Sequence, residues 1–168
     1  DFIQMNKSIS IKKTIIHKQD HSSGKTLCCQ KGLELAKGEY IMFIDAKDKL
    51  HDKNSIERIV KEFDSDKSIE AVIMRGSVKD ETMVLEENRY PRDKEFELAR
   101  NANNRDLLRL IGTQPCESYI GIQVSALSTV YLKKIGGFNL KYPNLNSWPL
   151  WVKICERGAC LKFVDEIM

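Results

Sequence analysis

The sequence lacks long apolar runs, a strong excess of charge of one sign, and a regular cysteine pattern. No run approaches the roughly 18 apolar residues of a membrane-spanning helix, and no signal peptide opens the chain. The 27 basic and 24 acidic residues are interspersed and leave a formal net charge of +3. That balance is too mild to indicate a nucleic-acid-binding face, so we expect no nucleic-acid partner.

Cysteine is scarce and irregularly placed. The chain has five cysteines, an odd number, and no Cys-x-x-Cys pair. Cys28 and Cys29 are adjacent, which is a poor geometry for pairing with each other. We therefore predict reduced, mostly buried thiols and a reducing, cytoplasmic compartment.

Nothing divides the chain into parts, because it contains neither an internal repeat nor a linker rich in glycine and serine. The 168 residues suit one domain with a substantial core, so we expect a single domain over residues 1–168. Strand-like and helix-like segments alternate in the first half, which predicts an α/β fold with a mostly parallel sheet flanked by helices. The expected strands are 14–17, 40–44, 71–74, 123–128 and 161–164, and the expected helices are 26–36, 54–63, 105–111, 130–135 and 148–156.

One long segment, residues 79–104, is polar and offers few core candidates. We expect it to be an irregular excursion over the surface, with a short helix near residues 95–100. We also expect it to be the least ordered part of the chain, because few apolar side chains anchor it.

The apolar run at residues 40–44, which we expect to form a central strand, stops on the sequence Asp45-Ala46-Lys47-Asp48. Doubly wound sheets bind ligands at the carboxyl ends of their strands, and we expect Asp45 to open into a cleft there. Two acids in that position could hold a divalent cation or a ribose hydroxyl. Capping of the next helix and turn formation remain the alternative from these residues alone.

Other motifs are weaker. Residues 22–26, Ser-Ser-Gly-Lys-Thr, resemble the end of a P-loop, but Gln19 stands where that loop needs its first glycine. His17 and His21 have the spacing of two zinc ligands on a helix, yet they lie in a strand-like run and a turn, so polar surface histidines are the simpler interpretation. No Gly-x-Gly-x-x-Gly is present, which argues against an unrelated Rossmann-type binder.

Several segments together resemble the family 2 glycosyltransferases, which have the GT-A fold, a Rossmann-like α/β fold. Residues 24–32 resemble the family pattern Gly-x-x-x-A-R-N-x-G, and residues 36–48 resemble A-x-G-E-Y-I-x-F-L-D-A-D-D. Residues 133–139 look like its I-G-G-F-D-E turn, and residues 146–154 look like its E-D-x-x-L-W-x-R-I helix. The resemblance covers most of the chain and keeps the order of the family's motifs.

The resemblance implies transfer of a sugar from a nucleotide-sugar donor to an acceptor hydroxyl. The family's D-x-D acids hold the ribose and a Mg²⁺ or Mn²⁺ ion that neutralises the leaving diphosphate. In this chain the implied donor-binding residues are Asp45, Lys47 and Asp48, and the implied metal ligands are Asp45 and Asp48. The implied partners are the donor and a glycan or lipid-linked acceptor, with peripheral membrane association through regions outside this sequence.

The departures from the family pattern include the positions that bind the metal ion and that supply the general base. Lys47 stands where a metal-binding acid is expected, so the D-x-D motif is degenerate and we predict that Mn²⁺ adds little to nucleotide affinity. Asn146 and Ser147 stand where the E-D pair supplies the general base, and neither can act as a base near pH 7. Cys29 and Gln30 replace the Arg-Asn pair.

Nothing in the sequence matches the first strand and acidic loop of the family, so we expect the domain to be incomplete on its N-terminal side. The catalytic residues cannot be assigned from the pattern. The alternative is a catalytically inactive GT-A module that binds a partner or a glycan.

Overall fold

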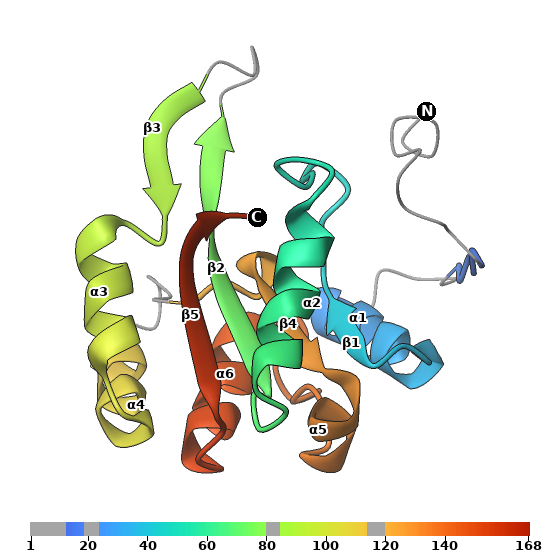
Figure 1. Ribbon diagram of the computed structural model, residues 1–168. Coiled ribbons are helices and arrows are strands. Elements are labelled where there is room, and N and C mark those ends of the chain that lie inside the picture. The colour runs from blue at the N-terminus through green and yellow to red at the C-terminus, as the bar shows by residue number, and fades with distance from the viewer. Residues whose placement is uncertain (1–12, 19–23, 80–84, 114–119) are drawn as a thin grey trace.

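The computed structural model describes residues 13–18, 24–79, 85–113 and 120–168 (Figure 1). In chain order its elements are α1 (Lys25–Leu35), β1 (Tyr40–Met42), α2 (Ser55–Ser65), β2 (Ala71–Lys79), β3 (Leu85–Tyr90), α3 (Asp93–Asn101), α4 (Asn104–Thr113), η1 (Ile122–Val124), β4 (Ser125–Ser128), α5 (Thr129–Lys134), α6 (Ser147–Glu156) and β5 (Leu161–Ile167). The five expected helices are confirmed, each end within two residues of its expected position. None of these described helices has the length and apolar character to cross a membrane.

The sheet is built around β2, which contacts three other strands. Along its first half β2 pairs antiparallel with β4 and parallel with β5, and β1 extends the sheet beyond β4 in the antiparallel direction. Beyond Arg75, β2 pairs antiparallel with β3 (Figure 1). The α/β class is confirmed, but three of the four described pairings are antiparallel, which corrects the expectation of a mostly parallel sheet. The connection from β2 to β4 contains β3, α3, α4 and η1. A connection of this length allows β4 to run antiparallel to β2, whereas a single crossover helix would join two parallel strands.

The strand before Asp45 is shorter and less central than expected. β1 covers only residues 40–42, its side chains are half-buried, and it lies at one edge of the described sheet. Its ladder ends at Met42 because the partner strand begins at Ser125, directly after the turn of η1. Residues 14–17 also differ from expectation, since they form no regular secondary structure and Ile16 is exposed.

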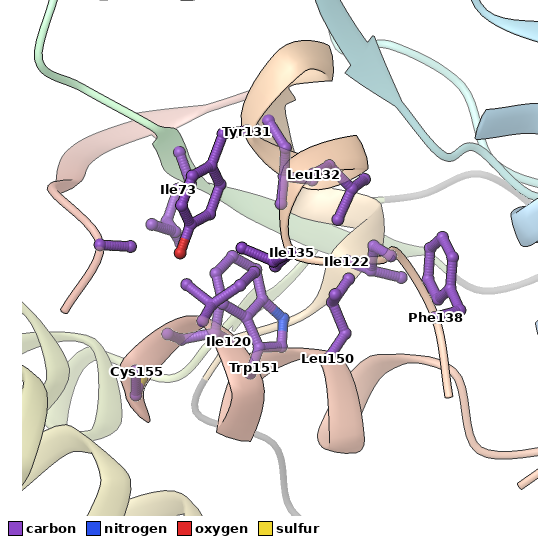
Figure 2. Close-up of a cluster of buried hydrophobic side chains, with 14 of the residues drawn as sticks. Ile73, Ile120, Ile122, Tyr131, Leu132, Ile135, Phe138, Leu150, Trp151 and Cys155 are labelled. Atoms are coloured by element: carbon purple, nitrogen blue, oxygen red, sulfur yellow. The ribbon is translucent and has the colours of Figure 1, made fainter. Parts of the chain in front are cut away.

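The two faces of the sheet pack against different helices, as the alternation of side chains along a strand requires. Ala71 and Ile73 of β2 point into the larger cluster, which also includes residues of α1, α4, α5 and α6. Figure 2 shows its centre, formed by Ile73, Ile120, Ile122, Tyr131, Leu132, Ile135, Phe138, Leu150, Trp151 and Cys155. Val72 and Met74 point to the opposite face, where α2 contributes Ile59 and Phe63.

Residues 80–84 of the polar segment lie outside the described residues, but residues 85–104 are better anchored than their polarity suggested. The segment contains β3 and α3, the latter confirming the expected short helix, and Phe96 and Ala99 of α3 are fully buried. Arg75 of β2 holds the start of α3: Nη1 donates to the Pro91 carbonyl at 3.0 Å and to Asp93 Oδ1 at 2.8 Å. The expectation of an irregular excursion is therefore wrong. Two buried side chains and one buried arginine anchor the segment, although it has few apolar residues.

Cysteine burial also differs in part from the expectation. Cys29 and Cys155 are buried, whereas Cys28 and Cys160 are exposed, and these four described cysteines form no disulfide with one another. The prediction of mostly buried thiols thus holds for two of the four.

Candidate functional site

Asp45 lies just beyond the carboxyl end of β1, as the sequence predicted. After β1 the chain continues through residues 43 and 44 and then turns, with the Asp48 amide donating to the Asp45 carbonyl at 3.0 Å. The side chain of Asp45 is 35% exposed, so solutes can reach its carboxylate while neighbouring groups still hold it in place.

The closest cation to Asp45 is Lys25, twenty residues earlier in the chain. Lys25 is the first residue of α1, and its Nζ lies 2.6 Å from Asp45 Oδ2. This hydrogen bond is the main reason why the pKa of Asp45 lies below its usual value, against the opposing effect of partial burial. The charge of Lys25, a hydrogen bond from the Gln123 side chain and the charge of Lys47 lower the pKa further.

The other two residues of the implied donor site lie in the turn that follows. Lys47 is exposed at its tip, and Asp48 is half-buried. Among the described residues no side-chain hydrogen bond or ion pair joins Asp48 to Asp45. The structure therefore brings Asp45 together with Lys25 rather than with Asp48.

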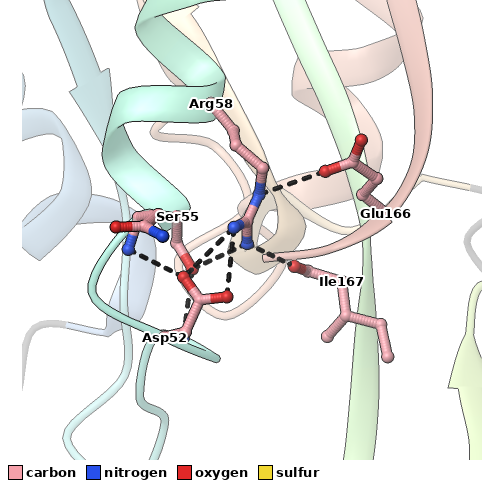
Figure 3. A network of polar contacts seen from close by, with 6 residues as sticks. Asp52, Ser55, Arg58, Glu166 and Ile167 are labelled. Carbon is pink, nitrogen blue, oxygen red and sulfur yellow. Dashed lines mark hydrogen bonds and ion pairs between the residues drawn. The ribbon is translucent and has the colours of Figure 1, made fainter.

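The chain after this turn is fixed to the far end of β5 by a polar network around Arg58 of α2 (Figure 3). Arg58 Nη1 lies 3.0 Å from Asp52 Oδ2, Nη2 donates to the Ile167 carbonyl at 3.1 Å, and Nε lies 3.1 Å from Glu166 Oε2. The backbone amide of His51 also donates to the Met168 carbonyl at 2.9 Å. The segment between Asp45 and α2 is thus held at its α2 end.

The first turn of α1 also contacts a loop more than a hundred residues away, residues 139–146. Thr26 is fully buried there; its backbone amide donates to the Pro143 carbonyl at 2.9 Å, and its Oγ1 donates to the Tyr142 carbonyl at 2.6 Å. Gly24 permits this approach, because it has a φ of 84° and a Cβ in its place would lie 2.4 Å from the Pro143 oxygen.

Cys29 and Asn146 are in contact at the buried side of this junction. Asn146 Nδ2 donates to Cys29 Sγ at 3.4 Å, and both side chains are buried. Burial raises the pKa of the Cys29 thiol, and the hydrogen bond from Asn146 opposes part of that rise. Next to Asn146, the hydroxyl of Ser147 is buried and has no hydrogen-bond partner among the described residues. Neither side chain offers a base to a bound molecule.

Comparison with known families identifies the family to which the chain belongs. Residues 3–127 match the profile of "Glycosyl transferase family 2", which is about three quarters of the chain. The chain belongs to glycosyltransferase family 2. No curated protein gives a significant match to the sequence. The family 2 match includes α1, β1 and Asp45 but ends before the 139–146 loop.

In family 2 terms, the structure joins segments that the sequence resemblance identified separately. The glycine-initiated helix α1 places Lys25 against Asp45, the acid at the strand end. It also places Cys29, at the position of the family's arginine, against Asn146, at the position of its E-D acids. Both residues of that second pair differ from the family pattern, and the contact between them joins a neutral thiol and an amide.

The residues around Asp45 do not fit the divalent metal that the family resemblance implies. Mg²⁺ and Mn²⁺ prefer several oxygen ligands, whereas the nearest charged group to Asp45 is an ammonium at 2.6 Å. No group of three or more histidine, cysteine, aspartate or glutamate side chains among the described residues could hold a metal ion. Asp45 and Asp48 therefore do not form a cation site in this arrangement.

Two cavities lie elsewhere. One, of about 350 Å³, lies between α1 and α5 and is lined by Gln30, Glu34, Lys133 and Gly137 among others. The other, of about 630 Å³, lies between α3 and α4. Neither is lined by Asp45, so a cleft at the strand end stays a prediction.

Lys25 and Gln123 are the site residues that the sequence did not reveal. Lys25 drew attention only as part of a failed P-loop pattern, and Gln123 only as the start of an expected strand. Their position beside Asp45 depends on how α1 and η1 pack, which no local spacing encodes. The glycine at the start of the family pattern was the one available signal for the Lys25 position.

Proposed function

We propose that this family 2 domain binds a nucleotide-sugar donor with Asp45 on the nucleotide side and transfers its sugar to an acceptor hydroxyl. The observation that supports this proposal is the convergence on the first turns of α1. Lys25 meets Asp45 there, and Thr26 meets the 139–146 loop, although these segments are far apart in the sequence. A glycan or lipid-linked acceptor and a cytoplasmic location belong to the same proposal.

The reaction requires three events. The acceptor oxygen attacks the anomeric carbon of the sugar, the bond from that carbon to the diphosphate oxygen breaks, and the acceptor gives up its proton. Asn146 and Ser147 cannot take that proton, so a working enzyme needs a base outside these two positions. The nucleoside diphosphate leaves with the electrons of the broken bond.

Binding and turnover are best measured separately. We expect nucleoside diphosphate-sugars to raise the melting temperature of the domain, because a ligand that binds only the folded state stabilises it. Release of nucleoside diphosphate with an acceptor present then measures transfer. Asp45→Asn should lower both signals, while Asp64→Asn, at an exposed acid of α2 that pairs with Lys67, should change neither. Absence of any donor-dependent shift would refute the proposal.

A second candidate function is a non-catalytic module that binds a donor, a glycan or a partner. The contact between Cys29 and Asn146 favours it, because the position of the family's base carries a buried amide. Donor binding without turnover, together with a gain of turnover in Asn146→Asp, would establish this second function. Turnover by the unaltered chain would exclude it.

A further inference from the structure

The cation that stands beside Asp45 belongs to the chain itself. Lys25 Nζ lies 2.6 Å from Asp45 Oδ2, which is the distance of a charge-assisted hydrogen bond. Lys47, the residue that replaces the family's second D-x-D acid, is exposed in the turn and makes no such contact. An ammonium of the chain itself therefore lies at the strand end where the family pattern leads one to expect a metal ion.

The Lys25–Asp45 pair remains open to a ligand. The two side chains are 38% and 35% exposed, and ion pairs with that exposure are weak and exchange readily. The ammonium has three donors and needs only one for Asp45, so a phosphate oxygen can share it without displacing the carboxylate. Lysine binds phosphate in this way as a point charge.

We propose that Lys25 supplies the positive charge that a divalent metal would supply, so that the site binds a nucleoside diphosphate without a metal. This inference rests on the proposed donor-binding function and concerns how the same site handles the charge of the diphosphate. Lys47 lies in the turn after Asp45 but is not the residue in contact with it.

The test is isothermal titration of the intact chain with uridine diphosphate and with guanosine diphosphate, each in EDTA and again in Mn²⁺. We expect the dissociation constant for the nucleotide that binds to differ by less than about twofold between the two conditions. Lys25→Met should weaken binding at least about tenfold, since it removes the charge and keeps the apolar stem. Lys25→Arg should stay within about threefold, and so should the matched control Lys61→Met, at an exposed lysine of α2.

A second pair of variants tests the metal side directly. If Lys25 occupies the cation position, Lys47→Asp alone should gain little dependence on Mn²⁺, because the ammonium still repels the ion. The double variant Lys25→Met with Lys47→Asp should bind the diphosphate more tightly in Mn²⁺ than in EDTA.

Each outcome decides the inference. Binding by the unaltered chain that requires Mn²⁺ would overturn it and leave the proposed function standing, and this measurement needs no variant to fold. Unchanged binding by a folded Lys25→Met, checked by circular dichroism, would also overturn it. Binding of neither nucleotide in any condition would overturn both this inference and the proposed function.

Discussion

Replacing Arg75 tests how residues 85–113 are held to the sheet. Arg75 is 2% exposed, and its guanidinium carbon lies 4.1 Å from the centre of the Phe96 ring. It donates to the Pro91 carbonyl and to Asp93, and its Nε lies 2.5 Å from Asp165 Oδ1, although that contact lacks hydrogen-bond alignment. We expect Arg75→Ala to lower the free energy of unfolding more than any change to one of these partners.

The magnitude follows from the individual contacts. A carbonyl left without its donor costs about 1–3 kcal/mol, the cation–π contact contributes about 0.5–2 kcal/mol, and the shortened side chain leaves a cavity. Together these contributions put the cost of Arg75→Ala at about 2–5 kcal/mol, and the carboxylates that lose their partner, Asp93 and Asp165, stay solvated because both are exposed. Asp93→Asn should cost less than about 1 kcal/mol, because the Asp93 side chain is 80% exposed.

Urea unfolding followed by circular dichroism measures these differences. Arg75→Met serves as a volume-matched variant that loses the charge and the donors but keeps the stem, and it should fall between the other two. Hydrogen exchange should accelerate in α3 of Arg75→Ala before it accelerates in α2. The reasoning is refuted if Arg75→Ala costs less than about 1 kcal/mol or no more than Asp93→Asn.

Three further predictions concern α1, the thiols and acid stability. Gly24→Ala should destabilise the fold by about 1–3 kcal/mol in urea unfolding, because the φ of residue 24 is 84° and its Cβ would meet the Pro143 carbonyl. Gly32→Ala, with open space around it, should be neutral or stabilise α1 by up to about 1 kcal/mol. Iodoacetamide at pH 8 should label Cys160, which is exposed, well before Cys155, whose thiol pKa burial raises to about 12; mass spectrometry that finds equal rates would contradict this. The lysine partner of Asp45 lowers the pKa of that carboxyl in the folded state, so above pH 4 the wild type should exceed Asp45→Asn in free energy of unfolding by less than about 1 kcal/mol. The difference should vanish as the pH falls through that lowered pKa. A difference that instead grew in acid would show that the pair does not stabilise the fold.

The helices were the most predictable part of the fold. Apolar residues of α2 recur at the helical period, and Ile59 and Phe63 are buried as that period requires. Strand lengths and directions were less predictable, since β1 ends where its partner begins and not where its apolar run ends. The anchoring of α3 was hidden in the sequence because one buried arginine, Arg75, rather than an apolar stripe, fixes its start.

For the site, the sequence identified Asp45 but not the residue that faces it. Lys47 is only two residues away in the chain, yet it is exposed in the turn. Lys25 reaches Asp45 because α1 begins beside the strand end, a contact between residues twenty positions apart. Spacing along the chain cannot rank such contacts, because they depend on the packing of a helix on a sheet.

Helix α1 connects the two sides of the proposed site, which are the strand end at Asp45 and the 139–146 loop. Its first turn is tied to the strand end through Lys25 and to the 139–146 loop through Thr26, and one turn later Gln30 Oε1 accepts from the Phe138 amide at 3.0 Å. Sliding α1 along its axis would break all three attachments together. Helix α1 therefore fixes the distance between Asp45 and the 139–146 loop, and a substitution that shifts the loop will also move the Lys25 ammonium beside Asp45.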